Sequence, residues 1–164
     1  IVYKGKHFNL SNCGMHAMDI MRMESGFLHW GHDISPEENQ YQAGLSFAIS
    51  KKKDVDFIGK KAIEKIKQEK TITRFAMFTL KESEPGKPLL LHDEPIYIDD
   101  KIIGRSTSGN YSFNFKKNLV FGYIENNLSN DELKYKNLFI EVEKKKYPIS
   151  IQLRALKRTD YKNL

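Results

Sequence analysis

The chain has 164 residues, of which 40% are hydrophobic and 29% are charged, and its formal net charge is +6 at pH 7. This length is enough to bury a core without disulfides or metals, and a single cysteine excludes an internal disulfide. No apolar run reaches the roughly 20 residues that a membrane span needs. The lysines form short scattered runs rather than one dense basic patch, so we expect no nucleic-acid partner and no membrane partner.

The first part of the chain predicts two helices. Residues 12–24 have a suitable N-cap in Asn12, apolar side chains on most sides and Gly26 just past the end. A helix of this kind is normally buried. Further elements are predicted in chain order: a loop at residues 34–42, a short buried strand at 45–49, and an amphipathic helix at 58–67.

After residue 70 the pattern changes to short β-branched and aromatic runs separated by turn signals. The predicted strands are residues 74–81, 95–98, 102–107, 119–124, 138–142 and 149–153. Strands at this spacing indicate a small antiparallel barrel or sandwich. We predict a closed or nearly closed barrel whose core contains Phe75, Met77, Ile103, Val120, Phe121 and Ile140.

The most informative segment runs from Met21 to Asp33 and reads MRMESGFLHWGHD. It places one carboxylate, Glu24, at the end of an apolar helix, followed by a glycine and two aromatic residues. A carboxylate there can accept two N–H donors from a flat nitrogen heterocycle while the aromatic rings exclude water.

This segment resembles the R-x-E-x-G-x-x-x-W/Y-G-H/N-E/D segment of the glycine-cleavage T-protein (aminomethyltransferase) superfamily. Three further segments are similar to the same family in the same order, and they begin at Asp56 (DFIGKKAI), Gly104 (GRSTSGNYS) and Lys117 (KNLVFGYI). The resemblance implies an α+β fold. Residues 1–70 would form the C-terminal part of an α/β folate-binding domain and residues 71–164 a small antiparallel β-barrel. In its details, the first segment resembles the corresponding segment in the folate domain of dimethylglycine and sarcosine dehydrogenases.

The resemblance implies one-carbon transfer from an amine to tetrahydrofolate, with Glu24 binding the pterin. Trp30 either stacks on that ring system or fills a seam between domains. The family's aspartate nearest the chemistry comes from an earlier segment that no residue here matches. We therefore predict no catalytic residue in this chain, and we expect it to be inactive without a missing N-terminal half or an equivalent partner chain.

Three other residues are candidate folate contacts by the same resemblance. Lys53 and Arg74 lie roughly where the family has a basic folate contact, and Tyr161 lies where some members have a tyrosine. A lysine cannot form the two-pronged contact of an arginine, so plain surface charge also explains Lys53. His29 and His32 are spaced as metal ligands can be, but no further ligand set accompanies them, so we predict no metal.

Several alternatives stay open from the sequence. The one-carbon donor is glycine-derived, dimethylglycine, sarcosine or a sulfonium, and FAD is expected only in a missing upstream domain. An alternative hypothesis is that the chain is a non-catalytic interaction module with a vestigial folate site. The resemblance suggests a cytoplasmic protein, or a mitochondrial-matrix protein in a eukaryote. We also expect Met15, Met18 and Met21 to be exposed, because the missing half would cover them.

Overall fold

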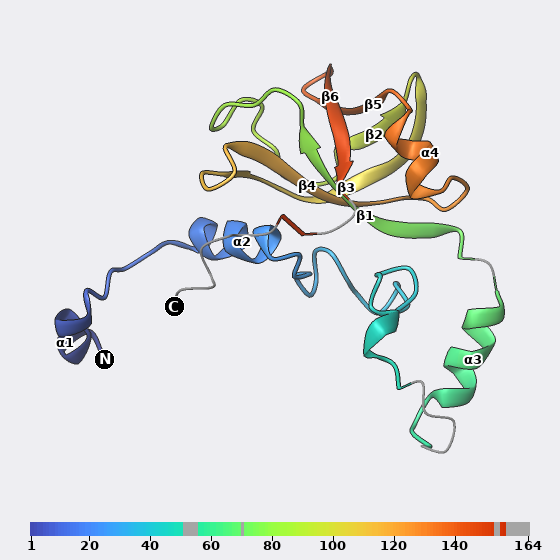
Figure 1. Cartoon of the computed structure of the whole chain (residues 1–164), viewed down its shortest axis with the longest axis horizontal. Coiled ribbons are helices and arrows are strands. Elements are labelled where there is room, and N and C mark those ends of the chain that lie inside the picture. The colour runs from blue at the N-terminus through green and yellow to red at the C-terminus, as the bar shows by residue number, and fades with distance from the viewer. Residues whose placement is uncertain (51–55, 70, 153–154, 157–164) are drawn as a thin grey trace.

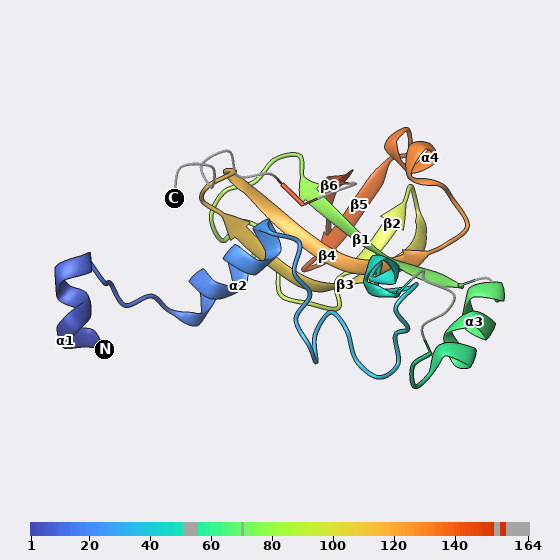
Figure 2. The same cartoon turned by 60° about the horizontal axis from the view of Figure 1, so that its bottom comes forward.

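The computed structural model describes residues 1–50, 56–69, 71–152 and 155–156. The helical elements are α1 (Val2–Gly5), η1 (Lys6–Phe8), α2 (Met15–Glu24), η2 (Ser46–Ala48), α3 (Lys60–Gln68) and α4 (Asn130–Lys134). The strands are β1 (Thr73–Leu80), β2 (Pro95–Ile98), β3 (Lys101–Ser112), β4 (Lys117–Glu125), β5 (Leu138–Val142) and β6 (Lys145–Gln152). Helix α2 lies against the outside of the strands, whereas α1 and α3 stand apart from them (Figures 1 and 2).

The strands form a closed antiparallel barrel in the order β1-β4-β3-β2-β5-β6. Every predicted strand in this region is present, although β3 continues to Ser112 and β6 begins already at Lys145. Closure leaves no unpaired sheet edge, which removes the usual site of edge-to-edge aggregation. The predicted α+β fold with a C-terminal antiparallel barrel is confirmed.

The barrel interior is a single apolar cluster. Its fully buried side chains include Phe78, Leu80, Ile96, Ile124, Ile140 and Ile149. The predicted core residues Ile103, Val120 and Ile140 belong to it.

Three other predicted core residues, Phe75, Met77 and Phe121, instead belong to a second cluster with Met23 of α2. Strand β1 is apolar on both faces. Phe75 and Met77 on its outer face pack against the second cluster, and the face that points into the barrel is that of Ala76, Phe78 and Leu80. Side chains alternate between the two faces of a strand, so a sequence in which both faces are apolar does not show which face points into the barrel. The predicted barrel-core positions of Phe75, Met77 and Phe121 are therefore wrong.

Strands β3 and β4 approach each other closely at two glycines. A Cβ atom on Gly104 would lie 2.0 Å from the carbonyl oxygen of Tyr123, and one on Gly122 would lie 2.4 Å from that of Arg105. Just after these points along β3 the register of the two strands shifts, because Ser106 pairs with Gly122 but Ser108 pairs with Phe121. Thr107 is therefore the extra residue of a β-bulge.

Helix α2 begins at Met15 with Gly14 as its N-cap, later than the predicted Asn12. Within the described chain, only Met23 and Glu24 of this helix are buried. Its three other methionines, Met15, Met18 and Met21, are 72%, 51% and 42% exposed, as expected.

Two further predictions in this part of the chain had different outcomes. Residues 45–49 were expected to form a buried strand but contain the 3-10 turn η2, with Phe47 78% exposed. A five-residue apolar run does not by itself specify a strand, and no described strand pairs with it. The second predicted helix is present as α3, which starts after Gly59. Within the described ranges, no helix has both the length and the apolar character that a membrane span requires.

The close approach of β3 and β4 leads to a stability prediction. Gly122→Ala should lower the free energy of unfolding by about 1–3 kcal/mol, because its new methyl group meets the backbone of Arg105 and Ser106. The matched control is Gly14→Ala, since a Cβ there meets nothing within 4 Å. Urea unfolding of both variants provides the measurement. Equal midpoints for the two variants would contradict the proposed steric constraint.

Candidate functional site

The segment after α2 folds back into a compact turn, here called the 28–34 loop. The carbonyl oxygen of His29 accepts hydrogen bonds from the N–H groups of His32 (3.2 Å) and Asp33 (2.8 Å). The N–H of Gly31 donates to the carbonyl of Ile34 at 2.8 Å, and Gly31 adopts φ of 88°, a conformation that favours glycine. The loop thus satisfies much of its own backbone while its tip, Trp30, stays 65% exposed.

Asp33 anchors this loop, and it has no exposed surface. Its Oδ1 accepts hydrogen bonds from the hydroxyls of Thr107 (2.5 Å) and Ser108 (2.8 Å). Successive side chains of a regular strand point to opposite faces. The bulge at Thr107 breaks that alternation, so two consecutive hydroxyls reach the same carboxylate oxygen.

The other oxygen of Asp33 forms an ion pair with Arg22 of α2. It also accepts the backbone N–H of His29 at 2.9 Å. Arg22 is further held by Asp19 (2.7 Å) and donates to the Ser108 hydroxyl (2.7 Å). Its guanidinium carbon lies 5.4 Å from the ring centroid of Phe121, within cation–π range.

A side chain of strand β4 holds the same loop by a hydrogen bond to the loop's backbone. The hydroxyl of Tyr123 donates to the carbonyl oxygen of Asp33 at 2.8 Å. Burial raises the pKa of Tyr123 above its ordinary value, with smaller contributions from the charges of Glu38 and Asp33. The phenol therefore remains a proton donor at neutral pH.

Glu24 forms a second buried link between α2 and the barrel. The side chain is 1% exposed. Its Oε1 accepts a hydrogen bond from Ser112 at 2.5 Å, and Asn114 donates to both of its oxygens at 3.0 and 2.8 Å. These hydrogen bonds and the near-complete burial tie this carboxylate to the barrel.

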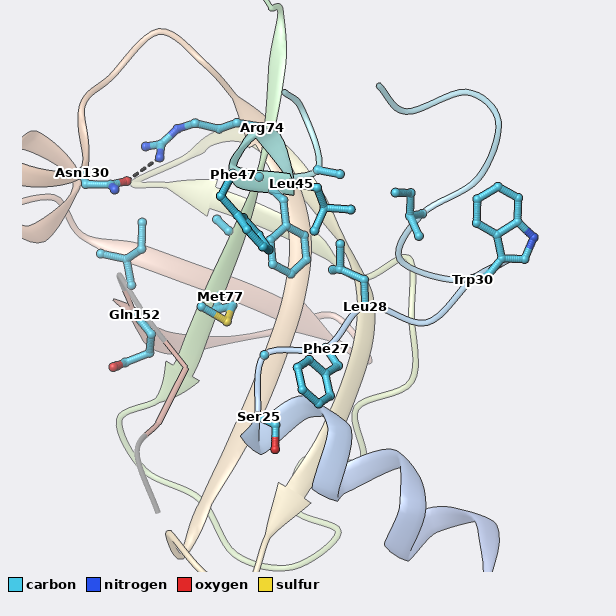
Figure 3. A pocket seen from close by; sticks show the side chains of 17 residues that line it. Ser25, Phe27, Leu28, Trp30, Leu45, Phe47, Arg74, Met77, Asn130 and Gln152 are labelled. Atoms are coloured by element: carbon cyan, nitrogen blue, oxygen red, sulfur yellow. Dashed lines mark hydrogen bonds between the residues drawn. The ribbon is translucent and has the colours of Figure 1, made fainter. Parts of the chain in front are cut away.

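An open groove of about 860 Å³ lies between the 28–34 loop and β1 (Figure 3). Its walls are mainly apolar, and they include Phe27, Leu28, Trp30, Phe47 and Met77. Trp30 stands at one side of the groove and Arg74 at the other, while Glu24 is not among the lining residues. The structure therefore brings two predicted site residues to one groove.

Among the described residues that line this groove, Arg74 is the only charged one. It donates hydrogen bonds to Asn130 and to the carbonyl oxygen of Leu128 (3.1 Å). Its Nε–H is buried and has no hydrogen-bond partner among the described residues. Burial lowers the pKa of Arg74, yet an arginine remains charged at neutral pH. The groove thus combines apolar walls with one cation whose bonding capacity is not fully used.

A second groove, of about 540 Å³, lies on the other side of the 28–34 loop, between α2 and β3. Its lining includes Met15, Met18, Arg22, His29 and His32. The rings of His29 and His32 are 4.5 Å apart. Even so, the described residues contain no group of three or more His, Cys, Asp or Glu side chains that could hold a metal ion.

The remaining predicted site residues, Lys53 and Tyr161, lie outside the described residues. Sequence reasoning missed the hydrogen-bonding network of Asp33, with its partners Arg22, Thr107, Ser108 and Tyr123. A signal was present, because Arg22 and Asp33 lie in the first motif and the two hydroxyl residues lie in the third. Nothing in a linear pattern says that these two motifs contact each other.

Comparison of the sequence with family models and comparison with known proteins identify the same family. Residues 1–53 match the GCVT N-terminal domain, and residues 74–156 match the glycine cleavage T-protein C-terminal barrel domain. The chain is 33% identical to human mitochondrial dimethylglycine dehydrogenase over 129 residues, which is 79% of this chain and 14% of that protein. It is 32% identical over 120 residues to an aminomethyltransferase of Symbiobacterium thermophilum, covering 73% of this chain and 31% of that one.

The fold also matches a solved structure. The glycine cleavage system aminomethyltransferase T from Bartonella henselae superposes with a TM-score of 0.69 at 23% identity, over 83% of this chain and 37% of that chain. The chain therefore spans less than two fifths of the length of each of these three proteins. On its two matched domains, it belongs to the glycine cleavage T-protein family.

Proposed function

We propose that this chain contributes one wall of a tetrahydrofolate site in a protein that transfers a one-carbon unit from an amine. The observation that carries the proposal is the groove with apolar walls that has Trp30 at one side and Arg74 at the other. Family membership supports it, since relatives are named aminomethyltransferase and dimethylglycine dehydrogenase. A folate has a flat heterocycle at one end and carboxylates at the other, which matches these two kinds of side chain.

The residues present fit such a ligand on chemical grounds. The exposed indole of Trp30 offers a face for a flat ring, and the apolar side chains beside it exclude water from that ring. Arg74 lines the groove, and its guanidinium can form a charge-assisted contact to a carboxylate. Tetrahydrofolate itself supplies the nucleophilic nitrogen that captures the one-carbon unit. The work of this chain is therefore to orient the ligand and keep water away from it.

We further propose a two-part organisation, with residues 1–70 in an α/β folate-binding domain and residues 71–164 in the barrel domain. The exposed methionines of α2 would then pack against an N-terminal half or an equivalent partner chain. FAD, if the gene product uses it, would bind in another domain.

The first functional prediction concerns Arg74. In the gene product that carries this sequence, Arg74→Ala should weaken binding of folinic acid about tenfold, equivalent to about 1.4 kcal/mol. Binding of the analogue that lacks the glutamate should not change, because Arg74 contacts only the carboxylates. Calorimetric titration measures both ligands. Arg105→Ala is the matched control, since Arg105 is an exposed arginine of β3 whose ion pair is with Asp93.

Each contrary result for Arg74→Ala has a definite meaning. An equal loss for both ligands would show that the variant damages the groove rather than a carboxylate contact. Unchanged affinity for folinic acid would remove Arg74 from the site.

The second functional prediction separates the two roles of Glu24. Because Ser112 and Asn114 already use its oxygens, we expect Glu24→Gln to lower the free energy of unfolding by about 1–3 kcal/mol. Folinic acid affinity should stay unchanged, and Ser112→Ala should reproduce the stability loss. Thermal unfolding and calorimetry give the two readouts. A large loss of affinity at unchanged stability would instead support the pterin contact predicted from the sequence.

A further inference from the structure

The position of Trp30 depends on the backbone on either side of it. The side chain is 65% exposed, so packing fixes only a minor part of its surface. Its neighbours in the 28–34 loop, Leu28 and Ile34, line the same groove. Whatever holds this loop therefore sets one wall of the groove.

The loop is closed by two reciprocal bonds between the same residues. The N–H of Asp33 donates to the carbonyl of His29 at 2.8 Å, and the N–H of His29 donates to the Asp33 carboxylate at 2.9 Å. Trp30 lies between these two residues in the chain. Without the hydrogen bond to the Asp33 carboxylate, only the backbone hydrogen bond between Asp33 and His29 would close the loop.

The closed loop is attached to the rest of the molecule at Asp33. The side chain binds Arg22 of α2 and the two hydroxyls of the β3 bulge, and its carbonyl oxygen accepts the hydroxyl of Tyr123 from β4. Three elements thus hold one residue of the loop. Asp33 itself has no exposed surface and is absent from the lining of both grooves, so it does not touch a ligand bound there.

We infer that Asp33 is the positioning residue for Trp30 and so sets the shape of the groove that Trp30 and Arg74 share. The ligand part of this inference rests on the proposed function, but the positioning itself does not. Trp30 is the only tryptophan in the 164 residues, so its fluorescence reports on this position alone.

The first experiment measures the time-resolved fluorescence anisotropy of the chain. Asp33→Asn should fold, because the hydroxyls of Thr107 and Ser108 can accept as well as donate hydrogen bonds. It removes the charged partner of Arg22 in the loop, and we expect a larger share of the Trp30 anisotropy to decay within nanoseconds. Glu94→Gln is the matched control, because Glu94 binds Ser106 of the same strand without touching the loop. Its anisotropy should equal that of the wild type.

Tyr123→Phe provides a second, milder variant. It removes only the hydrogen bond to the carbonyl of Asp33, so it should fold even if Asp33→Asn does not, and it should also loosen Trp30. The inference is overturned if the anisotropy of Trp30 is unchanged in each of these two variants that folds.

The second experiment is a double-mutant cycle for folinic acid in the gene product that carries this sequence. Asp33→Asn should weaken binding about tenfold in the wild type and less than about twofold in a Trp30→Ala background, since its effect passes through Trp30. Equal losses in the two backgrounds would overturn the link to Trp30. A wild type that does not bind folinic acid would contradict the proposed function, while the anisotropy would still decide the positioning role of Asp33.

Discussion

One buried carboxylate, that of Asp33, joins three parts of this molecule: helix α2, the 28–34 loop and the barrel. Asp33 accepts hydrogen bonds from Arg22, Thr107, Ser108 and the backbone of His29, and it has no contact with solvent. A buried ion pair costs several kcal/mol of desolvation per ion, which its own attraction only partly offsets. Here the additional hydrogen bonds satisfy the remaining positions on both partners. The pair therefore specifies a single arrangement of helix, loop and barrel rather than simply adding stability.

This constraint explains why the motifs that characterise the sequence occur together. Arg22 and Asp33 belong to the first motif, and Thr107 and Ser108 belong to the third; Glu24 and Ser112 form a second link between the same two motifs. The bulge at Thr107 is needed because it turns two successive hydroxyls toward one oxygen. Gly104 and Gly122 lie just before that bulge along β3, at points where β3 and β4 leave no room for a Cβ atom. Residues that look like ligand contacts in the sequence thus partly serve the fold.

The sequence predicts the barrel well because its strands are short, apolar and separated by turn residues. It fails where the decision depends on distant partners. Both faces of β1 are apolar, and only the three-dimensional packing shows that Phe78 points inward and Phe75 outward. Residues 45–49 are apolar enough for a strand, but the described chain offers them no strand to pair with. For the site, Trp30 and Arg74 do line one groove, whereas the structural partners of Glu24 are 88 and 90 residues away and were not foreseeable.

Amide hydrogen exchange tests the role of Asp33 most directly. Residues 29–32 are exposed, so an ordinary surface loop at this place would exchange its amide hydrogens rapidly. If Asp33 holds the loop to the barrel, the N–H groups of His29, Gly31 and Asp33 should instead be protected, with exchange rates close to those of β3. Exchange at the rate of an unprotected peptide for these three amides, alongside a protected β3, would contradict this account.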